Sequence, residues 1–322
     1  MDPLTHIVIG RAVVAAARDE RRNHLVGAAA ILGALSPDID SVIAFTGWDR
    51  YVRAHQFGTH SLVGMLVTAS LAAIAVGRWA NAFPPRRSAE AGAQIPVGAL
   101  FCAAAAGALS HIVLDLVSGA RIAILWPFVD RRLSLPLVAM ADPWIVGICA
   151  AWLLLLWPAR IPLRRASQTV IAVTVVFLCF KAWMLGMALR HLDGTRHATA
   201  LEARWGSLTD WFVFQRRPDQ VSISALASRG GPPPVVMTRP LAPDTRYVRA
   251  SRSLDDVQNF LAVHEFAFPA ETNEGDGRVS VMWSDLRYCS PTGCDVWVGG
   301  TFDASGRPMA QEVRVGTVVQ RR

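Results

Sequence analysis

Apolar residues collect in long blocks along this chain, and all of the blocks lie before about residue 190. Such blocks are typical of membrane spans, because a soluble core distributes its apolar residues more evenly along the sequence. The composition agrees: 52% of the 322 residues are hydrophobic, and the mean hydropathy is +0.31. We therefore expect a mainly α-helical, polytopic bundle of membrane helices.

The blocks divide this bundle into predicted helices. The first begins at Pro3, because Asp2 suits an N-cap and proline suits the first helical position, and it ends near Ala17. It is short for a span, which needs about 20 residues. Further apolar segments cover residues 25–45, 61–77, 95–117, 135–157 and 168–189. The pattern predicts five or six spans within a transmembrane domain of residues 1–190.

Residues 191–322 have a different character and predict a small, β-rich extramembrane domain. Alternating runs at 278–283 and 295–299 are typical of strands, and residues 254–263 favour a helix. Gly230-Gly231-Pro232-Pro233-Pro234 has the composition of a linker. Cys289 and Cys294 flank a Pro-Thr-Gly turn, where a small disulfide loop can close.

The positive charge of +7 comes almost entirely from arginine, since Lys181 is the only lysine. The arginines lie between apolar blocks without a basic helix or an aromatic platform, which argues against nucleic acid as a partner. Loops 18–24, 78–94 and 158–168 share one side and carry nine arginines, against five in loops 46–60 and 119–134. The positive-inside rule predicts that the first set is cytoplasmic and that the C-terminal domain lies outside.

Residues with metal-binding side chains map to the less basic membrane face. They are His6, Asp38, Asp40, His55, His60, His111 and Asp115. His111 and Asp115 are four residues apart on a predicted helix, so they share one face and can hold a single ion. Acidic groups at membrane depth usually mark function. We expect a metal site on the extracytoplasmic side of the bundle.

Asp38 and Asp40 are two apart in a break that Pro37 starts, where extended backbone points both carboxylates to one side. This arrangement can chelate one ion or bridge two, and either carboxylate can act as a catalytic general base. Mixed His and Asp ligands favour zinc, with manganese second. Arg121, six residues after Asp115, is either a substrate-binding group for a phosphate or carboxylate or an arginine at the lipid headgroups.

Several short strings resemble the signature of the YdjM-like membrane-bound metal-dependent hydrolases, a LexA-regulated inner-membrane type. The strings are Thr5-His6, Leu35-Ser36-Pro37-Asp38-Ile39-Asp40, His55-x-x-x-Thr59-His60-Ser61, Ser110-His111-Ile112-Val113-Leu114-Asp115 and Leu125-Trp126-Pro127. The family often has His-Arg-Gly-Phe-Thr-His where this chain has His55-Gln56-Phe57-Gly58-Thr59-His60, and Ser41 replaces a His of some members. The resemblance implies a multi-pass protein of the bacterial inner membrane with a hydrolytic metal site.

The expected function is hydrolysis of an ester, phosphoester or amide bond by metal-activated water. The substrate would be a small molecule, a lipid or a peptide, and membrane lipid is an expected partner. Two alternatives remain open. A metal-ion transporter should carry its ligands near the midplane on broken helices, with a repeat relation between halves. A non-catalytic scaffold should hold a closed, fully ligated structural site.

Overall fold

The computed structural model describes residues 1–17, 24–83, 95–156, 161–192, 198–241 and 243–321. Their contacts divide the chain into two compact units. The first comprises residues 1–40, 56–186 and 202–209, and the second comprises residues 41–55, 187–201 and 210–322. Each unit thus combines segments from both sides of residue 190. The predicted domain boundary at that residue stays a prediction.

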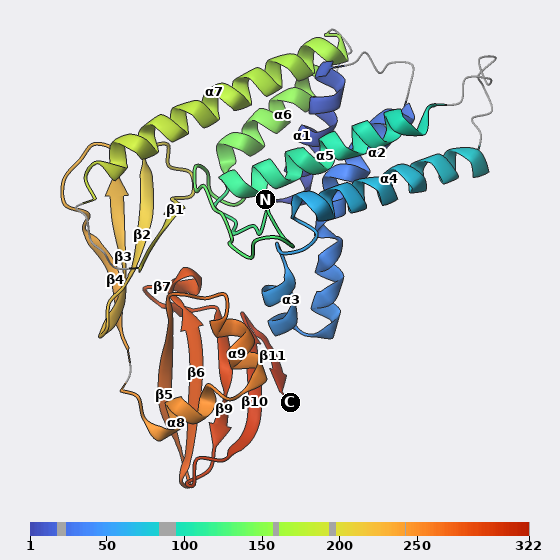
Figure 1. The fold of residues 1–322 in the computed structure, drawn as a ribbon. Helices are drawn as coiled ribbons and strands as arrows, with labels where there is room; N and C mark the ends of the chain where they lie inside the picture. Colours follow the sequence, from blue (N-terminus) through green and yellow to red (C-terminus); the bar gives the residue numbers. More distant parts are fainter. Residues whose placement is uncertain (18–23, 84–94, 157–160, 193–197, 242, 322) are drawn as a thin grey trace. The chain divides into compact units, whose positions relative to one another are not determined.

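The first unit is helical (Figure 1). Its helices are α1 (Pro3–Ala17), α2 (His24–Leu35), α4 (Leu62–Ala82), α5 (Val97–Val117), α6 (Pro143–Leu156) and α7 (Leu163–Leu189), and the 3₁₀ segment η1 (Ser36–Thr46) continues α2. Within the described residues, four segments are long and apolar enough to cross a membrane: α2 with η1, α4, α5 and α7. Helices α1 and α6 are shorter, so the predicted total of five or six spans stays a prediction.

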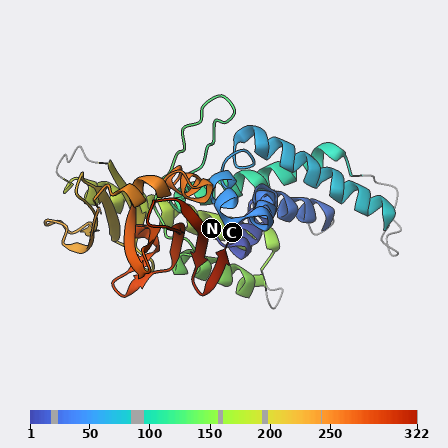
Figure 2. The ribbon, with the colours of Figure 1, turned by 90° about the horizontal axis from the view of Figure 1, so that it is seen from below.

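Helix α6 begins later than the predicted segment 135–157, so that prediction was wrong at its start. Asp142 caps the helix, because its Oδ1 accepts a hydrogen bond from the Trp144 N–H at 3.0 Å. The preceding residue, Ala141, has a φ of 52°, which a continuing helix does not allow. Residues 118–136 form a hairpin with bridges from Ser118 to Pro136 and from Ile122 to Leu133, visible as the green excursion in Figure 2.

Small residues let α2 and α5 approach until their backbones touch. A Cβ atom on Gly33 would lie 2.0 Å from the Ala104 carbonyl oxygen, and one on Gly107 would lie 2.1 Å from the Ala30 carbonyl oxygen. Alanines from α2, α4 and α5 fill the surrounding core. Close packing through glycine and alanine is typical of membrane helix pairs.

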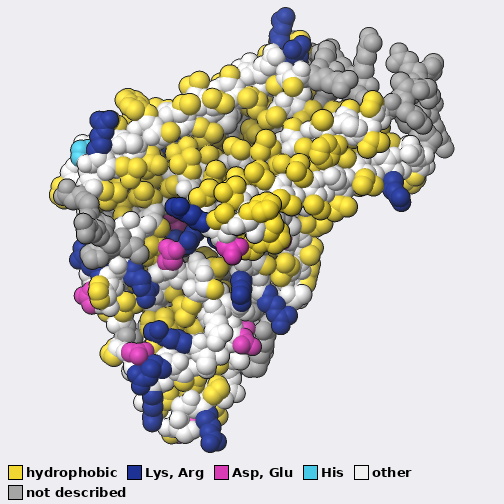
Figure 3. All heavy atoms as spheres, viewed as in Figure 1, with side chains coloured by type: hydrophobic (Ala, Val, Ile, Leu, Met, Phe, Trp, Pro, Cys, Tyr) yellow, Lys and Arg dark blue, Asp and Glu magenta, His cyan; other side chains and the backbone are white. Residues whose placement is uncertain are grey.

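The outer faces of these helices are apolar. Figure 3 shows hydrophobic side chains gathered over α4, α5 and α7. Leu71 of α4 is 57% exposed and Val176 of α7 is 69% exposed. A continuous apolar surface of this kind suits lipid contact. Lys181 of α7 is an exception that faces inward, since its buried Nζ donates to the Ser207 and Leu208 carbonyl oxygens at 2.9 and 3.3 Å.

The second unit contains residues 41–55 together with most of the C-terminal chain. Its short helix α3 (Trp48–Ala54) packs against α9 (Asp255–Leu261). The Trp48 and Phe260 rings lie 6.4 Å apart, and Arg53 donates to the Asn259 side chain at 2.9 Å. The chain between Asp40 and Gln56 is therefore folded into the second unit rather than forming a simple loop.

Besides a two-stranded ribbon, two larger sheets supply most of the rest of this unit, in agreement with the expected β-rich character. One has the order β1-β2-β3-β4 and the other β11-β10-β9-β6-β5. The strands are β1 (Ala198–Ala203), β2 (Asp210–Arg216), β3 (Gln220–Ala227), β4 (Val235–Pro240), β5 (Ala267–Gly275), β6 (Arg278–Asp285), β9 (Val296–Phe302), β10 (Pro308–Val315) and β11 (Val318–Arg321), with helix α8 (Arg246–Ser251) before α9. Strand β6 covers the run predicted at 278–283, and β9 covers the run predicted at 295–299 except its first residue.

Two local predictions for this region have opposite outcomes. The predicted linker at residues 230–234 was wrong, because β3 and β4 pair directly and these residues form the turn between them. Gly230 and Gly231 have φ values of 88° and 100°, which glycine adopts without strain. The predicted disulfide is confirmed: Cys289 and Cys294 are bonded between the short strands β7 (Cys289–Ser290) and β8 (Gly293–Cys294).

Candidate metal centre

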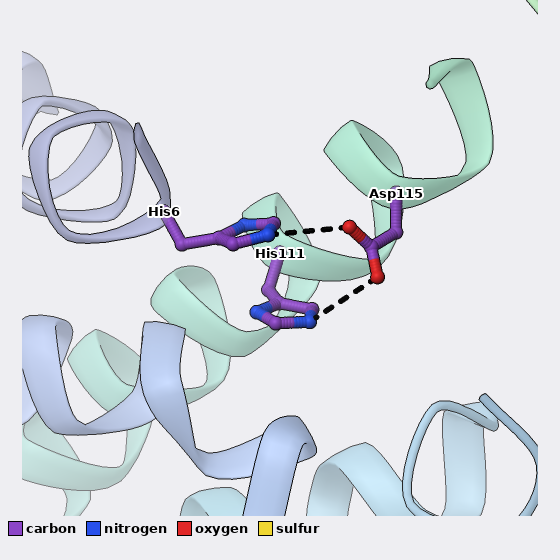
Figure 4. Close-up of side chains that lie close together, drawn as sticks. All are labelled: His6, His111 and Asp115. Carbon is purple, nitrogen blue, oxygen red and sulfur yellow. Dashed lines mark ion pairs between the residues drawn. The ribbon is translucent and has the colours of Figure 1, made fainter. Parts of the chain in front are cut away.

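The centre is built around His111, which lies one helical turn beyond the tight contact at Gly107. Its Nδ1 is 2.7 Å from the Ala34 carbonyl oxygen of α2. A carbonyl oxygen only accepts, so Nδ1 carries the proton and Nε2 is left with a lone pair. Asp115 follows on the same helix face, with its Oδ2 at 3.5 Å from His111 Nε2 (Figure 4). The helix contact thus orients a potential ligand nitrogen towards a carboxylate.

His60 and Asp38 bring two further donors to the same point. His60 directly precedes α4, where Ser61 caps the helix by accepting from the Gly64 N–H. Its Nε2 lies 3.2 Å from His111 Nε2. Asp38, in η1, places Oδ1 at 3.4 Å from His60 Nε2 and 3.5 Å from His111 Nε2. Both histidines are fully buried, whereas the Asp38 side chain is 29% exposed.

The spacing of the carboxylate oxygens from the two histidine nitrogens falls in the range of a coordination shell. The His60 and His111 Nε2 atoms lie 3.2 Å apart, and Asp38 Oδ1 and Asp115 Oδ2 each lie 3.4–3.6 Å from both nitrogens. Nitrogen and oxygen ligands lie about 2.0–2.2 Å from zinc, so the edges of their tetrahedron measure about 3.3–3.6 Å. The residues present therefore fit a divalent ion by donor type as well as by distance.

His6 of α1 adds a fifth donor with an unusual environment. Its ring stacks on His111 with centroids 3.7 Å apart, and its Nε2 lies 3.2 Å from Asp115 Oδ1, which the Met1 amino group also contacts (Figure 4). Although His6 is fully buried, neither ring nitrogen forms a hydrogen bond within the described residues. Buried polar atoms are normally satisfied, so this imidazole indicates a place for a ligand.

Asp40 lies on the other edge of the His60 ring. Its Oδ2 accepts hydrogen bonds from Thr59 Oγ1 at 2.9 Å and from the Gln56 N–H at 3.3 Å, and it lies 3.4 Å from His60 Nδ1. A carboxylate at this ring position fixes the orientation of a ligand histidine. Burial lowers the pKa of His60, but hydrogen bonds to Asp38 and Asp40 outweigh it, so the pKa is raised above its usual value.

The predicted ligands thus occupy several distinct places. Among the described residues of the first unit, the structure brings together two overlapping groups, His6 with His111 and Asp115, and Asp38 with His60 and His111. Asp40 stands beside them. His55 ends α3 in the second unit, where its ring stacks on Tyr51 at 4.7 Å. Arg121 lies in the hairpin 118–136. Its substrate-binding role and the catalytic and ligand roles of the others stay predictions.

Two contributors escaped the sequence analysis. Thr59 stood in a quoted string without an assigned role, although a hydroxyl next to a histidine is a natural partner for a nearby carboxylate. The Ala34 carbonyl oxygen has no side-chain signal at all. Only the small residues Gly33 and Gly107 hinted that backbone from α2 reaches α5.

Comparison with known proteins gives one match. Residues 1–191 match the family described as YdjM inner membrane protein, which covers more than half of the chain and every residue of the centre. No curated protein and no solved structure matches the chain.

Proposed function

Because the chain belongs to the YdjM inner membrane protein family, we propose that it is a membrane-bound metal-dependent hydrolase acting on an ester, phosphoester or amide bond. One observation carries the proposal: at the ends of apolar helices, the His60 and His111 Nε2 atoms lie 3.2 Å apart, and an oxygen of Asp38 and one of Asp115 each lie 3.4–3.6 Å from both of them. Ionisable groups are costly there unless they serve a site. Zinc suits the mixed donors, and manganese is the second choice.

In this proposal a divalent ion supplies Lewis acidity, which makes water a nucleophile near neutral pH and stabilises developing negative charge. The chain's own residues hold the ion and orient the side chains that bind it. The Ala34 carbonyl oxygen fixes His111, and Asp40 with Thr59 fixes His60. Asp38 is the partly exposed carboxylate of the group, so it is the residue that accepts a proton from attacking water.

A structural site in a non-catalytic scaffold is the second candidate. It is favoured by the closed arrangement, since four donors suffice for a tetrahedral ion and three of their residues are buried. Two observations favour catalysis. Asp38 is open to solvent on one side, and His6 and Asp40 exceed the number of ligands that a closed site needs. A transporter receives less support, because the donors lie at helix ends.

Metal content of the detergent-purified full-length protein tests the site. The wild type should contain about one divalent ion per chain, and His60→Ala and Asp115→Ala should lose it. His24→Ala is the control, since His24 starts α2 outside the donor cluster. A wild type without bound metal after supplementation with Zn²⁺ or Mn²⁺ would overturn the proposal.

Activity is then sought on lipid, phosphoester and peptide substrates with added Zn²⁺ or Mn²⁺. Asp40→Asn, His60→Ala and Asp115→Ala should each abolish turnover, and Asp40→Asn should do so with little loss of fold because it changes charge more than shape. If all three variants turn the substrate over at the wild-type rate, the site is not the catalyst, and a structural role replaces it.

We also propose that the centre and the C-terminal unit face the extracytoplasmic side. The support is the distribution of arginines, nine against five in the loops of the two sides. A probe with one free thiol, Ser88→Cys with Cys102, Cys149 and Cys179 replaced by alanine and the Cys289–Cys294 disulfide kept, should be protected from impermeant reagents in intact cells. Residue 88 lies outside the described residues. Labelling from outside the cell would reverse the orientation.

A further inference from the structure

The side chains that stand between the donors are apolar and exposed. Ile39, between the two aspartates of η1, is 55% exposed. Val113, between His111 and Asp115 of α5, is 45% exposed, although His111 is fully buried and Asp115 is 2% exposed. At the level of the donors, both segments thus present an apolar side chain to the surroundings. Ionisable groups inside a membrane usually face the protein interior, so lipid is expected at this level.

The candidate span that contains the two aspartates does not end at them. It runs from His24 to Thr46, so six residues follow Asp40 before the span ends. These residues include no Asp, Glu, Lys or Arg, and Val42 among them is 56% exposed. A site at the water boundary would be followed by polar chain. The continued apolar chain therefore indicates that the donors lie below the membrane surface.

A pair of exposed tryptophans in the first unit marks the level of that surface. The Trp144 Nε1–H donates to the Gly206 carbonyl oxygen at 3.1 Å. The Trp205 Nε1–H donates to the Ala141 carbonyl oxygen, also at 3.1 Å. The two residues are 46% and 67% exposed. Exposed indoles whose polar N–H is satisfied at one end are typical of the interface between membrane and water.

Helix α6 connects this level to the donor centre. Cys149 follows Trp144 by five residues, which is at most about 8 Å along a helix. Its thiol interacts with the side chain of Thr5, the neighbour of His6. The centre therefore lies about 8 Å below the tryptophan pair, which is the depth at which headgroups give way to acyl chains. Water and lipid both reach this depth, as hydrolysis of a lipid requires.

We propose that the donor centre lies at the boundary between lipid headgroups and acyl chains, and that its substrate is a membrane lipid that arrives from the bilayer. This inference rests on the proposed hydrolase function and narrows its substrate class. Asp38 is 29% exposed and directly precedes Ile39, so the open donor adjoins an exposed apolar side chain. A lipid at this depth brings its headgroup linkages level with the centre, whereas a soluble substrate must first cross the headgroup layer.

Depth-dependent quenching tests this placement without relying on turnover. Full-length protein with its three free cysteines replaced by alanine and its disulfide kept receives a fluorescent label at Ile39→Cys or, separately, at Val113→Cys. Each form is reconstituted into phosphatidylcholine vesicles. Lipids with a nitroxide near the headgroup should quench both labels more strongly than lipids with a nitroxide near the chain end. Metal content shows whether a label disturbs the centre, and the second position then decides.

Two further labelling positions are the matched controls. Val176→Cys lies in the middle of α7 at a residue that is 69% exposed, and the chain-end nitroxide should quench it most. Glu274→Cys lies at an exposed position of β5, where iodide on both sides of the vesicles should quench strongly. Iodide should quench the labels at residues 39 and 113 about fivefold less, because ions are excluded from lipid. Labels that behave like residue 274 overturn the placement, and so do labels that behave like residue 176.

The remaining outcomes separate this inference from the proposed function. Turnover of long-chain lipids in vesicles that His60→Ala abolishes supports the inference. Turnover of soluble phosphoesters or peptides without turnover of lipids overturns the substrate class and leaves the hydrolase function intact. Labels quenched at the expected depth in a protein that never retains metal overturn the hydrolase function, while they support the placement of these residues at the lipid boundary.

Discussion

Two buried histidines show how differently the two units use polar groups. In the second unit, His264 is 6% exposed, and its ring nitrogens lie 2.8 Å from the Phe260 carbonyl oxygen and 2.9 Å from the Tyr288 hydroxyl. In the first unit, His6 is fully buried and neither nitrogen forms a hydrogen bond within the described residues. The first histidine is satisfied by hydrogen bonds of the fold, whereas the second has a close contact with the Asp115 carboxylate but no hydrogen bond within the described residues.

The carboxylates repeat this contrast. Asp285 is fully buried in the second unit and accepts hydrogen bonds from the Phe266 and Arg287 N–H groups at 3.1 and 2.9 Å. Asp115 is 2% exposed, and its oxygens face three histidine rings from separate segments of the first unit. A buried polar group whose hydrogen bonds go to the backbone has a structural role. Groups that converge on one another indicate a ligand, and this difference supports the metal centre more strongly than burial alone.

The largest effect is expected where the first unit brings its donors together. In Gly107→Ala, a Cβ atom would lie 2.1 Å from the Ala30 carbonyl oxygen and 2.9 Å from the Ala34 nitrogen. Helices α2 and α5 must then separate, which moves the Ala34 carbonyl oxygen away from His111. We expect the free energy of unfolding of the first unit to fall by about 3 kcal/mol or more. Thermal unfolding in detergent and metal analysis measure both consequences.

Gly98→Ala is the matched control on the same helix, because a Cβ atom there meets nothing within 4 Å. It should leave metal content unchanged and raise stability by up to about 1 kcal/mol. Equal behaviour of the two variants would show that the contact between α2 and α5 does not position the centre.

Much of the first unit was predictable because its signals are local. Asp2 and Pro3 define the start of α1, and the helix ends at Ala17 as expected. The four-residue spacing of His111 and Asp115 determines a shared helix face whatever surrounds it. Metal binding also restricts residue types to a few, so ligand candidates are visible in the sequence before their geometry is known.

The features that could not be predicted from the sequence depend on contacts between residues that are distant in the chain. Residues 46–60 were expected to form a loop, but Trp48 and Arg53 contact Phe260 and Asn259, more than 200 positions away. The role of the Ala34 carbonyl oxygen follows from helix packing, and the side chain at that position does not predict it. Glycine and proline at residues 230–234 fit a linker and a hairpin turn equally well, and only the pairing of β3 with β4 decides between them.

A smaller effect, confined to the second unit, is expected from its disulfide. The double substitution Cys289→Ser and Cys294→Ser removes the disulfide, so the six-residue loop that it closes is no longer constrained in the unfolded chain. The chain-entropy estimate gives a loss of about 2 kcal/mol. Proteolysis during thermal unfolding should show earlier cleavage in residues 210–322, with metal content unchanged. The control Cys102→Ser, at an exposed position of α5, should stay within about 0.5 kcal/mol of wild type. Metal loss in the double variant would contradict this separation.

The smallest expected effect is that of His6→Phe, and comparing it with His264→Phe tests the two histidines directly. Phenylalanine keeps a planar ring but removes both nitrogens. In His264→Phe, the Phe260 carbonyl oxygen and the Tyr288 hydroxyl lose a partner, and the free energy of unfolding of the second unit should fall by about 1–3 kcal/mol. In His6→Phe, no hydrogen bond of the described residues is lost and the stacking on His111 is retained. Its stability in EDTA should therefore change by less than about 1 kcal/mol, or increase.

Metal content should distinguish the two variants in the opposite order from stability. His264→Phe should retain the ion at the wild-type level, because its neighbours belong to another unit. His6→Phe should retain less, since it removes a donor 3.2 Å from Asp115 Oδ1. Zinc should accordingly stabilise the wild type and His264→Phe against unfolding more than it stabilises His6→Phe. If His6→Phe destabilises the EDTA-treated protein as much as His264→Phe does, and zinc stabilises both equally, then His6 is an ordinary structural histidine. The unsatisfied imidazole would no longer support the assignment of a ligand to this centre, because removing it would cost the fold as much as removing a fully hydrogen-bonded ring.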